Sequence, residues 1–246
     1  LPDEVDLSYG PDEAHLLDVY RTDAATRRGT IVFVHGGGWT TGDKAALTSG
    51  MFGIFLSQLR RGFDLVSVEY RLAPEHPYPA ARDDVALAVS WVIDHGAEHG
   101  IDTSRIVLAG HSAGGTLASM VATTPGTPTE FGTIPRVDRF VAVAAMSALT
   151  DEHMLVDFPG DWGVPDPDRA TAAPLATIDA TDPPGYLVHG DSDGFVTDWH
   201  SRMLMWLGTA VGARLQLDLI DTGTLFCRGH YSPCGADMSP FERFLG

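Results

Sequence analysis

The segment 106–120, IVLAGHSAGGTLASM, constrains the fold more than any other part of the sequence. It begins with an apolar, β-prone run at residues 106–108 and ends in small residues that suit a helix. Between them, Gly110 and Gly114 flank Ser112 in a G-x-S-x-G pattern. A strand, a sharp turn and a helix in this order favour a nucleophile elbow, in which the positions two before and two after the serine must be small. The alternative is a glycine-rich turn with an incidental serine, because the chain has 27 glycines.

The composition indicates a globular protein with a sizeable core. Of its 246 residues, 44% are hydrophobic and 20% charged, which excludes a disordered chain. The net charge of −17 repels nucleic acids and anionic membranes, so neither is an expected partner. The chain has no apolar run of 18 residues. It opens without a signal peptide, although a cleaved one would leave no trace.

Strands and helices are predicted to alternate along most of the chain. The predicted strands lie at residues 30–34, 63–69, 106–108, 139–145, 186–189 and 215–220, and the predicted helices at 45–60, 80–95, 196–211 and 240–245. This alternation predicts an α/β fold with a mostly parallel central sheet covered by helices on both faces. An antiparallel hairpin at residues 5–20 precedes it. We expect one domain over residues 1–246, with an irregular insertion at about 149–182 lining the mouth of the site.

A glycine-rich loop follows the predicted strand 30–34. The sequence HGGGW at residues 35–39 lets the backbone approach a ligand and turn its N–H groups outward. Three glycines alone would suit a flexible loop, but directly after a buried strand and upstream of G-x-S-x-G they favour an oxyanion hole. His35 and His111 adjoin these two segments and are expected to be scaffold.

A serine hydroxyl attacks an ester only when a histidine removes its proton and a carboxylate orients that histidine. In such a sheet these groups lie on loops at the carboxyl ends of strands. Asp193 lies far enough into the loop after strand 186–189 to be the predicted acid, and Asp191 is the alternative, expected to be a turn residue. His230 is the only histidine after the last strand and is the predicted base. The order Ser112, Asp193, His230 is that of the α/β-hydrolase fold.

These motifs together resemble those of the α/β-hydrolase esterases. They comprise HGGGW at 35–39, YRLAPEHPYPAA at 70–81, GHSAGG at 110–115, a late G-x-x-D at 190–193 and G-H at 229–230. More narrowly, the chain resembles the hormone-sensitive-lipase-like branch and its small BD-FAE relatives, from about Val5 to Phe244. The resemblance implies a cofactor-free, metal-free serine carboxylesterase whose oxyanion hole uses the N–H groups of Gly37, Gly38 and Ala113.

The sequence departs from hormone-sensitive-lipase relatives in its N-terminal part. Those proteins carry a helical cap built from an N-terminal extension, whereas about 30 residues precede the oxyanion strand here, so no large cap is expected. An open site would favour acyl chains of about two to four carbons, because a longer tail would gain little of the roughly 0.8 kcal/mol per buried CH₂. Trp39, Phe158 and Trp162 are candidate walls of the pocket, or equally ordinary core or surface residues.

Other functions remain open at this point. The resemblance to BD-FAE proteins also allows an esterase acting on carbohydrate-linked acetyl or aromatic acyl groups, and aryl formamidases share the fold and a similar glycine-rich loop. A binding protein on a degenerate hydrolase scaffold would usually lack a triad residue, and this sequence has all three. The expected partner is a small-molecule ester, and the oligomeric state is not predicted.

The two cysteines flank the predicted base. Cys227 and Cys234 are seven residues apart and do not follow a zinc-binding spacing. A disulfide between them would hold the loop that carries His230, and it would favour a secreted protein over a cytoplasmic one. Two unpaired thiols are the alternative.

Overall fold

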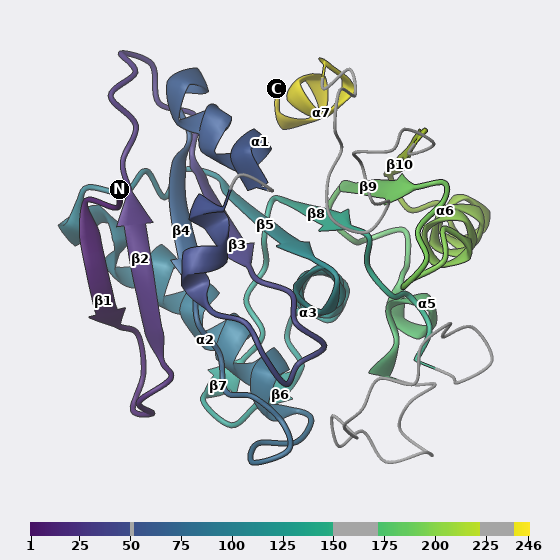
Figure 1. Ribbon diagram of the computed structural model, residues 1–246, viewed down its shortest axis with the longest axis horizontal. Coiled ribbons are helices and arrows are strands. Elements are labelled where there is room, and N and C mark those ends of the chain that lie inside the picture. Colours follow the sequence, from purple (N-terminus) through teal and green to yellow (C-terminus); the bar gives the residue numbers. More distant parts are fainter. Residues whose placement is uncertain (50–51, 150–171, 222–238) are drawn as a thin grey trace.

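The computed structural model describes residues 1–49, 52–149, 172–221 and 239–246. Within them, an eight-stranded sheet has the order β1-β2-β4-β3-β5-β8-β9-β10 (Figure 1). In that order the strands are Glu4–Ser8, Leu16–Tyr20, Asp64–Val68, Thr30–Val34, Ile106–His111, Arg139–Val143, Gly185–Gly190 and Leu215–Ile220. From β4 to β10 all neighbours pair in parallel, whereas β1 and β2 form an antiparallel hairpin and β2 runs antiparallel to β4. A separate hairpin joins β6 (Pro128–Thr129) and β7 (Gly132–Thr133).

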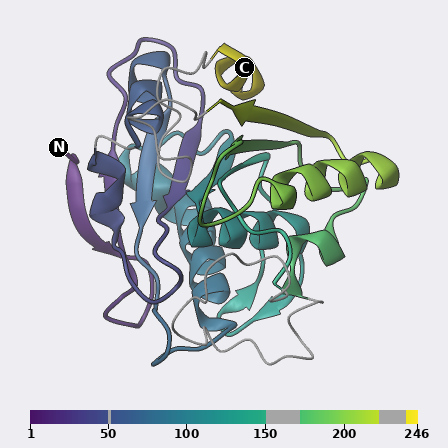
Figure 2. The same cartoon turned by 45° about the vertical axis from the view of Figure 1, so that its right-hand side comes forward.

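Helices cover both faces of the sheet, as the sequence predicted. One face packs against α2 (Ala80–His95), α3 (Ala113–Thr123) and α6 (Trp199–Val211), and the other against α1 (Gly53–Ser57) and α7 (Ser239–Leu245) (Figure 2). A short helix, α5 (Pro174–Thr177), lies beside α3 and α6. Successive residues of β3 alternate between the two cores: Val32 and Val34 belong to the first, and Ile31 and Phe33 to the second. The β-branched run of β3 is therefore buried on both sides, as parallel sheets require.

The strand order reverses between β3 and β5. The chain passes from β3 to β4 on one side, then crosses to β5 on the other side of β3 and continues outward to β8, β9 and β10. The carboxyl ends of β3 and β5 thus flank the topological switch point, where ligands bind in open α/β sheets. The glycine-rich loop follows β3 and the G-x-S-x-G turn follows β5, so the two predicted parts of the site meet there.

The prediction of one continuous helix at 45–60 is wrong. The described residues form a 3₁₀ helix at Lys44–Thr48, the short α1 and a second 3₁₀ helix, Gln58–Arg61. Ser49 has an extended backbone (φ −65°, ψ 145°). The sequence of the segment also contains Gly50 and Gly53, and each glycine costs a helix about 1 kcal/mol relative to alanine.

Helix α6 begins at Trp199 rather than at the predicted Val196. The residues before it belong to a loop held by the Asp193 carboxylate, which accepts hydrogen bonds from the backbone N–H groups of Phe195 and Val196. Most of the predicted insertion at 149–182 lies outside the described residues. Among the helices that are described, none combines the length and the apolar character needed to cross a bilayer.

Candidate active site

Ser112 occupies the turn between β5 and α3 in a strained backbone conformation. Its φ of 52° and ψ of −122° lie where residues other than glycine are rarely found, and such strain gathers at functional sites. The Ser112 N–H donates to the Val143 carbonyl at 2.8 Å, which fastens the turn to the end of β8. Thr116 on α3 adds a second tie, because its hydroxyl accepts a hydrogen bond from the Met146 N–H at 3.0 Å.

The two glycines of the motif are required by contacts with the backbone. A Cβ added at Gly114 would lie 2.2 Å from the Val34 carbonyl oxygen and 2.3 Å from that of His35. A Cβ at Gly110 would lie 2.3 Å from the Gly114 oxygen. Real Cβ atoms do not approach other atoms so closely, so the prediction that these positions must be small is confirmed. The short distances from Gly114 also show that the start of α3 packs directly against the end of β3.

The glycine-rich loop lies directly against Ser112. A Cβ built on Gly36 would be 3.2 Å from the Ser112 Cβ, and Gly37 and Gly38 have φ values of 123° and 60°. Among the described residues, the N–H groups of Gly37 and Gly38 donate to no protein acceptor. Ala113 is the first residue of α3, and the first N–H groups of a helix have no intrahelical acceptor. Three backbone donors therefore come from the two segments that flank the switch point.

His35, at the start of this loop, is fully buried and belongs to its scaffold. Its Nδ1 lies 2.7 Å from the Gly36 carbonyl oxygen and its Nε2 lies 3.0 Å from Oε1 of Glu69. The Tyr70 ring stacks on the imidazole at 4.3 Å, and the Tyr70 hydroxyl donates to the His35 carbonyl at 3.0 Å. Burial raises the pKa of Tyr70, so that hydroxyl stays a donor. No motif in the sequence marks Glu69, although this residue directly follows the buried strand β4.

The segment after Glu69 packs on the loop through buried polar contacts. The Ala73 N–H donates to the Trp39 carbonyl at 2.9 Å. Arg71 forms a buried bidentate pair with Asp84 of α2, at 2.7 Å for the shortest contact. Burial by itself would raise the pKa of Asp84, but hydrogen bonds from His15 and Arg71 outweigh burial and lower it. The irregular YRLAPEHPYP segment is thus anchored both to the glycine-rich loop and to α2.

The two candidate acids differ sharply in their surroundings. Asp193 has a fully buried carboxylate, in which Oδ1 accepts from the Phe195 and Val196 N–H groups at 2.8 and 3.0 Å and Oδ2 lies 3.3 Å from His189 Nε2. Asp191 is exposed and accepts a hydrogen bond from the neighbouring Ser192 hydroxyl. A buried, oriented carboxylate two strands from Ser112 favours Asp193 over Asp191 as the acid, and the assignment stays a prediction.

Several predicted site residues lie outside the described part of the chain. They are His230, Phe158, Trp162, Cys227 and Cys234, so the base, two of the three pocket walls and the disulfide stay predictions. Trp39 is described and is only 2% exposed, so its ring packs mainly in the core. His200, the only histidine after Asp193 within the described residues, lies in α6 and accepts hydrogen bonds at Nδ1 from the Ser147 and Ala148 N–H groups.

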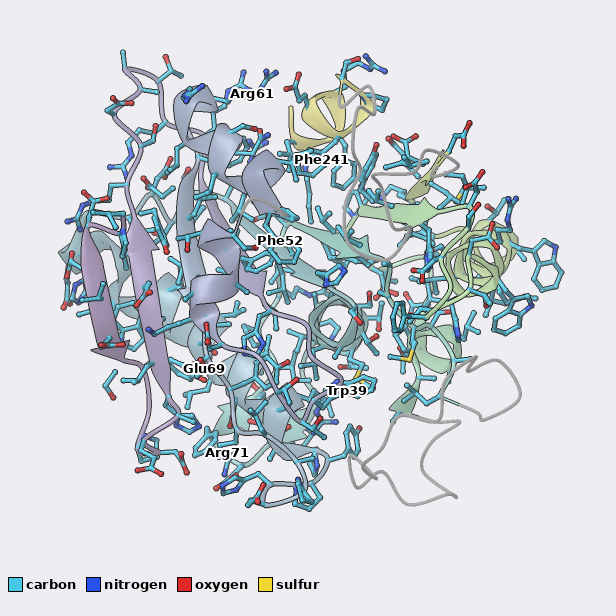
Figure 3. The ribbon with its side chains drawn as sticks, viewed as in Figure 1. Trp39, Phe52, Arg61, Glu69, Arg71 and Phe241 are labelled. Atoms are coloured by element: carbon cyan, nitrogen blue, oxygen red, sulfur yellow. The ribbon has the colours of Figure 1, made fainter. Side chains whose placement is uncertain are left out.

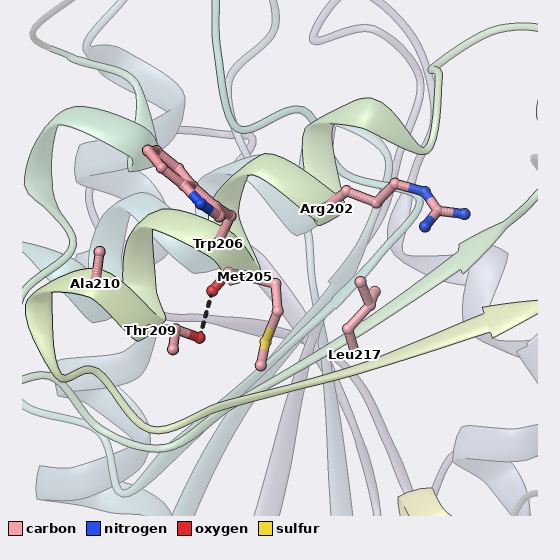
Figure 4. A pocket seen from close by; sticks show the side chains of 6 residues that line it. All are labelled: Arg202, Met205, Trp206, Thr209, Ala210 and Leu217. Carbon is pink, nitrogen blue, oxygen red and sulfur yellow. Dashed lines mark hydrogen bonds between the residues drawn. The ribbon is translucent and has the colours of Figure 1, made fainter.

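A separate hollow lies on the outer side of the sheet edge, between α6 and β10 (Figure 4). Its lining consists of Arg202, Met205, Trp206, Thr209, Ala210 and Leu217. None of the predicted catalytic residues borders it, and its one charged side chain, Arg202, is paired with Asp198 at 2.7 Å. This hollow is therefore distinct from the candidate active site at the carboxyl ends of β3 and β5.

Comparison with known proteins agrees with this architecture. Residues 17–159 match the BD-FAE family. The probable carboxylic ester hydrolase LipM of Mycobacterium tuberculosis is 31% identical over 218 residues, which are 80% of this chain and 49% of LipM. Esterase LipI of the same organism is 46% identical over 94 residues, 37% of this chain and 28% of LipI. The chain thus spans between about a quarter and a half of the length of these curated relatives.

Solved structures share the fold over nearly the whole chain. A truncated carbohydrate esterase from gut microbiota superposes with a TM-score of 0.82 at 23% identity, covering 98% of this chain and 94% of that one. Thermogutta terrifontis esterase 2 phosphonylated by sarin has a TM-score of 0.75 at 25% identity, covering 98% and 91%. The family match covers more than half of the sequence and includes both the oxyanion loop and the elbow. The chain belongs to the BD-FAE family of α/β-hydrolases.

Proposed function

We propose that this protein is a serine carboxylesterase that works through an acyl-enzyme intermediate. The observation that carries the proposal is the strained Ser112, set against a loop whose Gly37 and Gly38 N–H groups have no acceptor within the described residues. The Ser112 Oγ would attack the ester carbonyl, and the developing oxyanion would accept hydrogen bonds from these two groups and from Ala113. Donors placed in advance for that charge contribute roughly 3 kcal/mol each to transition-state stabilisation.

The proton transfers of the proposed reaction require the two remaining triad residues. In the proposed mechanism His230 takes the Ser112 proton as the nucleophile attacks and returns it to the leaving alcohol. Asp193 orients that histidine and stabilises its charged form. The carboxylate geometry supports this role, because two backbone donors fix one oxygen and leave the orientation of the other defined.

For the substrate, we propose esters with short acyl chains. Thermogutta terrifontis esterase 2 has been solved with propionate and with butyrate, at 24% and 25% identity to this chain. A second candidate is an ester carried on a carbohydrate. It is supported by the gut-microbiota carbohydrate esterase and by a bifunctional GH43-CE protein of Bacteroides eggerthii, which is 25% identical with a TM-score of 0.82.

Covalent labelling of Ser112 tests the mechanism. A fluorophosphonate probe should add one adduct to the protein, and peptide mass spectrometry should locate it on Ser112. The Ser112→Ala variant should form no adduct, and its kcat should be lower by several orders of magnitude. Ser119→Ala is the matched control, because Ser119 lies on the same helix and its hydroxyl donates to the Gly115 carbonyl. Unchanged turnover in Ser112→Ala would refute the serine mechanism.

A panel of substrates tests the specificity. Initial rates on chromogenic esters of rising acyl length should peak at about two to four carbons, since a longer tail gains little burial in an open site. Acetylated xylan and a feruloyl ester test the carbohydrate alternative, and a formyl-aryl amide tests for formamidase activity. Rates that rise steadily to long chains would contradict the short-acyl proposal.

A further inference from the structure

We propose that Glu69, acting through His35, is a positioning residue that sets the direction of the Gly37 N–H in the oxyanion hole. The inference rests on the proposed esterase function and adds to it a residue outside the triad and the hole. Glu69 follows β4, at the edge where β3 and β4 both end. In Figure 3 it lies in the lower half of the view with Trp39, and Arg61, which precedes β4, lies at the top.

The Glu69 carboxylate is held from two sides. Its Oε1 lies 3.0 Å from His35 Nε2, and its Oε2 accepts the Lys44 N–H at 3.0 Å. The backbone is fixed as well, because the Tyr9 hydroxyl donates to the Glu69 carbonyl at 2.6 Å and the Glu69 N–H donates to the Leu16 carbonyl at 2.9 Å. Only a carboxylate can accept from both His35 and Lys44, since a side-chain amide offers one acceptor atom and one donor atom.

The imidazole transmits this position to the Gly36 carbonyl. The Nε2 of His35 faces the carboxylate and its Nδ1 faces the Gly36 oxygen at 2.7 Å. Each ring nitrogen thus lies against an oxygen atom, of the Glu69 carboxylate on one side and of the Gly36 carbonyl on the other. Hydrogen bonds in such a chain strengthen one another, most of all where charge is involved.

The direction of the Gly36 carbonyl decides the direction of the Gly37 N–H. The bond between these residues is not among the cis peptides of the described chain, and in a planar trans peptide the C=O and N–H point in opposite directions. With the carbonyl held on the His35 side, the Gly37 N–H points away from His35. Gly36 itself lies against Ser112, so this peptide is next to the reacting atoms.

The second donor of the loop is oriented in the same manner by different groups. The Gly37 carbonyl accepts hydrogen bonds from the Thr40 N–H at 3.2 Å, the Thr41 N–H at 3.1 Å and the Thr41 hydroxyl at 3.0 Å. These bonds fix the peptide whose N–H belongs to Gly38. Each of the two loop donors is thus set by the carbonyl of its own peptide, and of these two only the Gly37 donor depends on Glu69.

Glu69→Gln is the decisive variant, because it keeps the size of the side chain and removes its ability to accept from both donors. We expect kcat to fall roughly 10- to 100-fold, less than the 10²- to 10³-fold loss that follows deletion of an oxyanion donor. KM should change less than about twofold, since the donor acts on charge that develops in the transition state. The inhibition constant of a trifluoromethyl ketone, which forms the charged tetrahedral adduct, should rise in parallel with the loss of kcat/KM.

Two further variants separate positioning from folding. His35→Asn keeps an N–H that can reach the Gly36 carbonyl and should retain more kcat than His35→Ala at equal melting temperature. Glu4→Gln is the matched control: Glu4 also binds a histidine, His99, at 2.8 Å, but on β1 away from the loop, and its loss should leave kcat and the ketone inhibition constant unchanged.

The outcomes distinguish the two levels of the proposal. A wild-type protein that hydrolyses no ester and takes up no fluorophosphonate would refute the proposed function. A wild type that is active, with Glu69→Gln equal to it in kcat and in ketone inhibition, would refute the positioning role alone. A rise in KM with unchanged kcat in Glu69→Gln would also refute it, because that pattern indicates loss of substrate binding rather than of oxyanion stabilisation.

Discussion

Replacing Gly114 with alanine tests the contact between the nucleophile elbow and the oxyanion loop. The added Cβ would lie 2.2 Å from the Val34 carbonyl oxygen and 2.3 Å from that of His35. Both are backbone atoms at the end of β3 and cannot rotate aside. Since real Cβ contacts stay beyond 3.0 Å, α3 and the end of β3 must separate by at least about 0.8 Å. That separation would change the distance between Ser112 and the proposed oxyanion donors, the N–H groups of Gly37 and Gly38.

Two opposing effects set the stability of this variant. Alanine is better than glycine in a helix by about 1 kcal/mol, and overpacking a tight interior costs about 1–3 kcal/mol or more. The net loss of up to about 2 kcal/mol would lower Tm by up to about 8 °C in a protein of this size. Activity should fall further, because a misplacement of about 1 Å at a reacting centre can cost 10²-fold.

Thermal denaturation and steady-state kinetics on one preparation provide the assay. Gly53→Ala is the control: Gly53 also lies in a helix, and a Cβ there has no neighbour within 4 Å, so Tm should hold or rise and kcat should not change. A Gly114→Ala protein with wild-type Tm and kcat would show that the elbow and the loop are not in the contact described.

Three other changes have defined outcomes. Asp193→Asn should lower kcat about 10³- to 10⁴-fold, while Asp191→Asn should be nearly neutral; the reverse result in steady-state kinetics would exchange the two assignments. Thr41→Val removes one of three hydrogen bonds to the Gly37 carbonyl, so kcat should fall about 2- to 10-fold, less than in Glu69→Gln. Burial raises the pKa of Asp182 to about 6; the folded protein therefore binds more protons than the unfolded chain, and this group lowers stability as pH rises from about 4 to 6. Asp182→Asn should remove that loss and add up to about 3 kcal/mol above pH 6, measured by urea denaturation from pH 4 to 8.

Elements with a strong local signal could be predicted to the residue. The strand at 30–34 and the helix at 80–95 have the expected bounds, because a β-branched run fixes the first and Pro79 and Gly96 delimit the second. The prediction for 45–60 failed, because its apolar spacing suits one helix while the extended backbone of Ser49 ends the first 3₁₀ helix. Local patterning therefore succeeded where propensity and periodicity agreed.

How far the site can be predicted from the sequence depends on whether one segment carries its geometry or several segments meet. The elbow has its glycine pattern and its two flanking elements within one segment, so the sequence indicates it, although its contacts with β3 and β8 come from the fold. Glu69 reaches His35 across 34 residues, and their contact depends on β4 pairing with β3. An acidic residue after the carboxyl end of a strand is a sequence signal for a site residue, and this signal led to Asp193. Only the strand order shows which loop such an acid faces.

The oxyanion loop combines conformational freedom with constraints supplied from outside it. Its glycines allow φ values of 123° and 60°, and they fix nothing by themselves, because glycine adopts many conformations at little cost. The constraints are the hydrogen bonds to its carbonyls from Thr41, from His35 backed by Glu69, and from Ala73 to Trp39. Two of these three depend on the chain that continues from β4, which pairs in parallel with β3. The reversal of strand order places β5 and its elbow on the other side of β3. The loop after β3 therefore lies between the elbow and the segment after β4, which can hold the donors in one orientation.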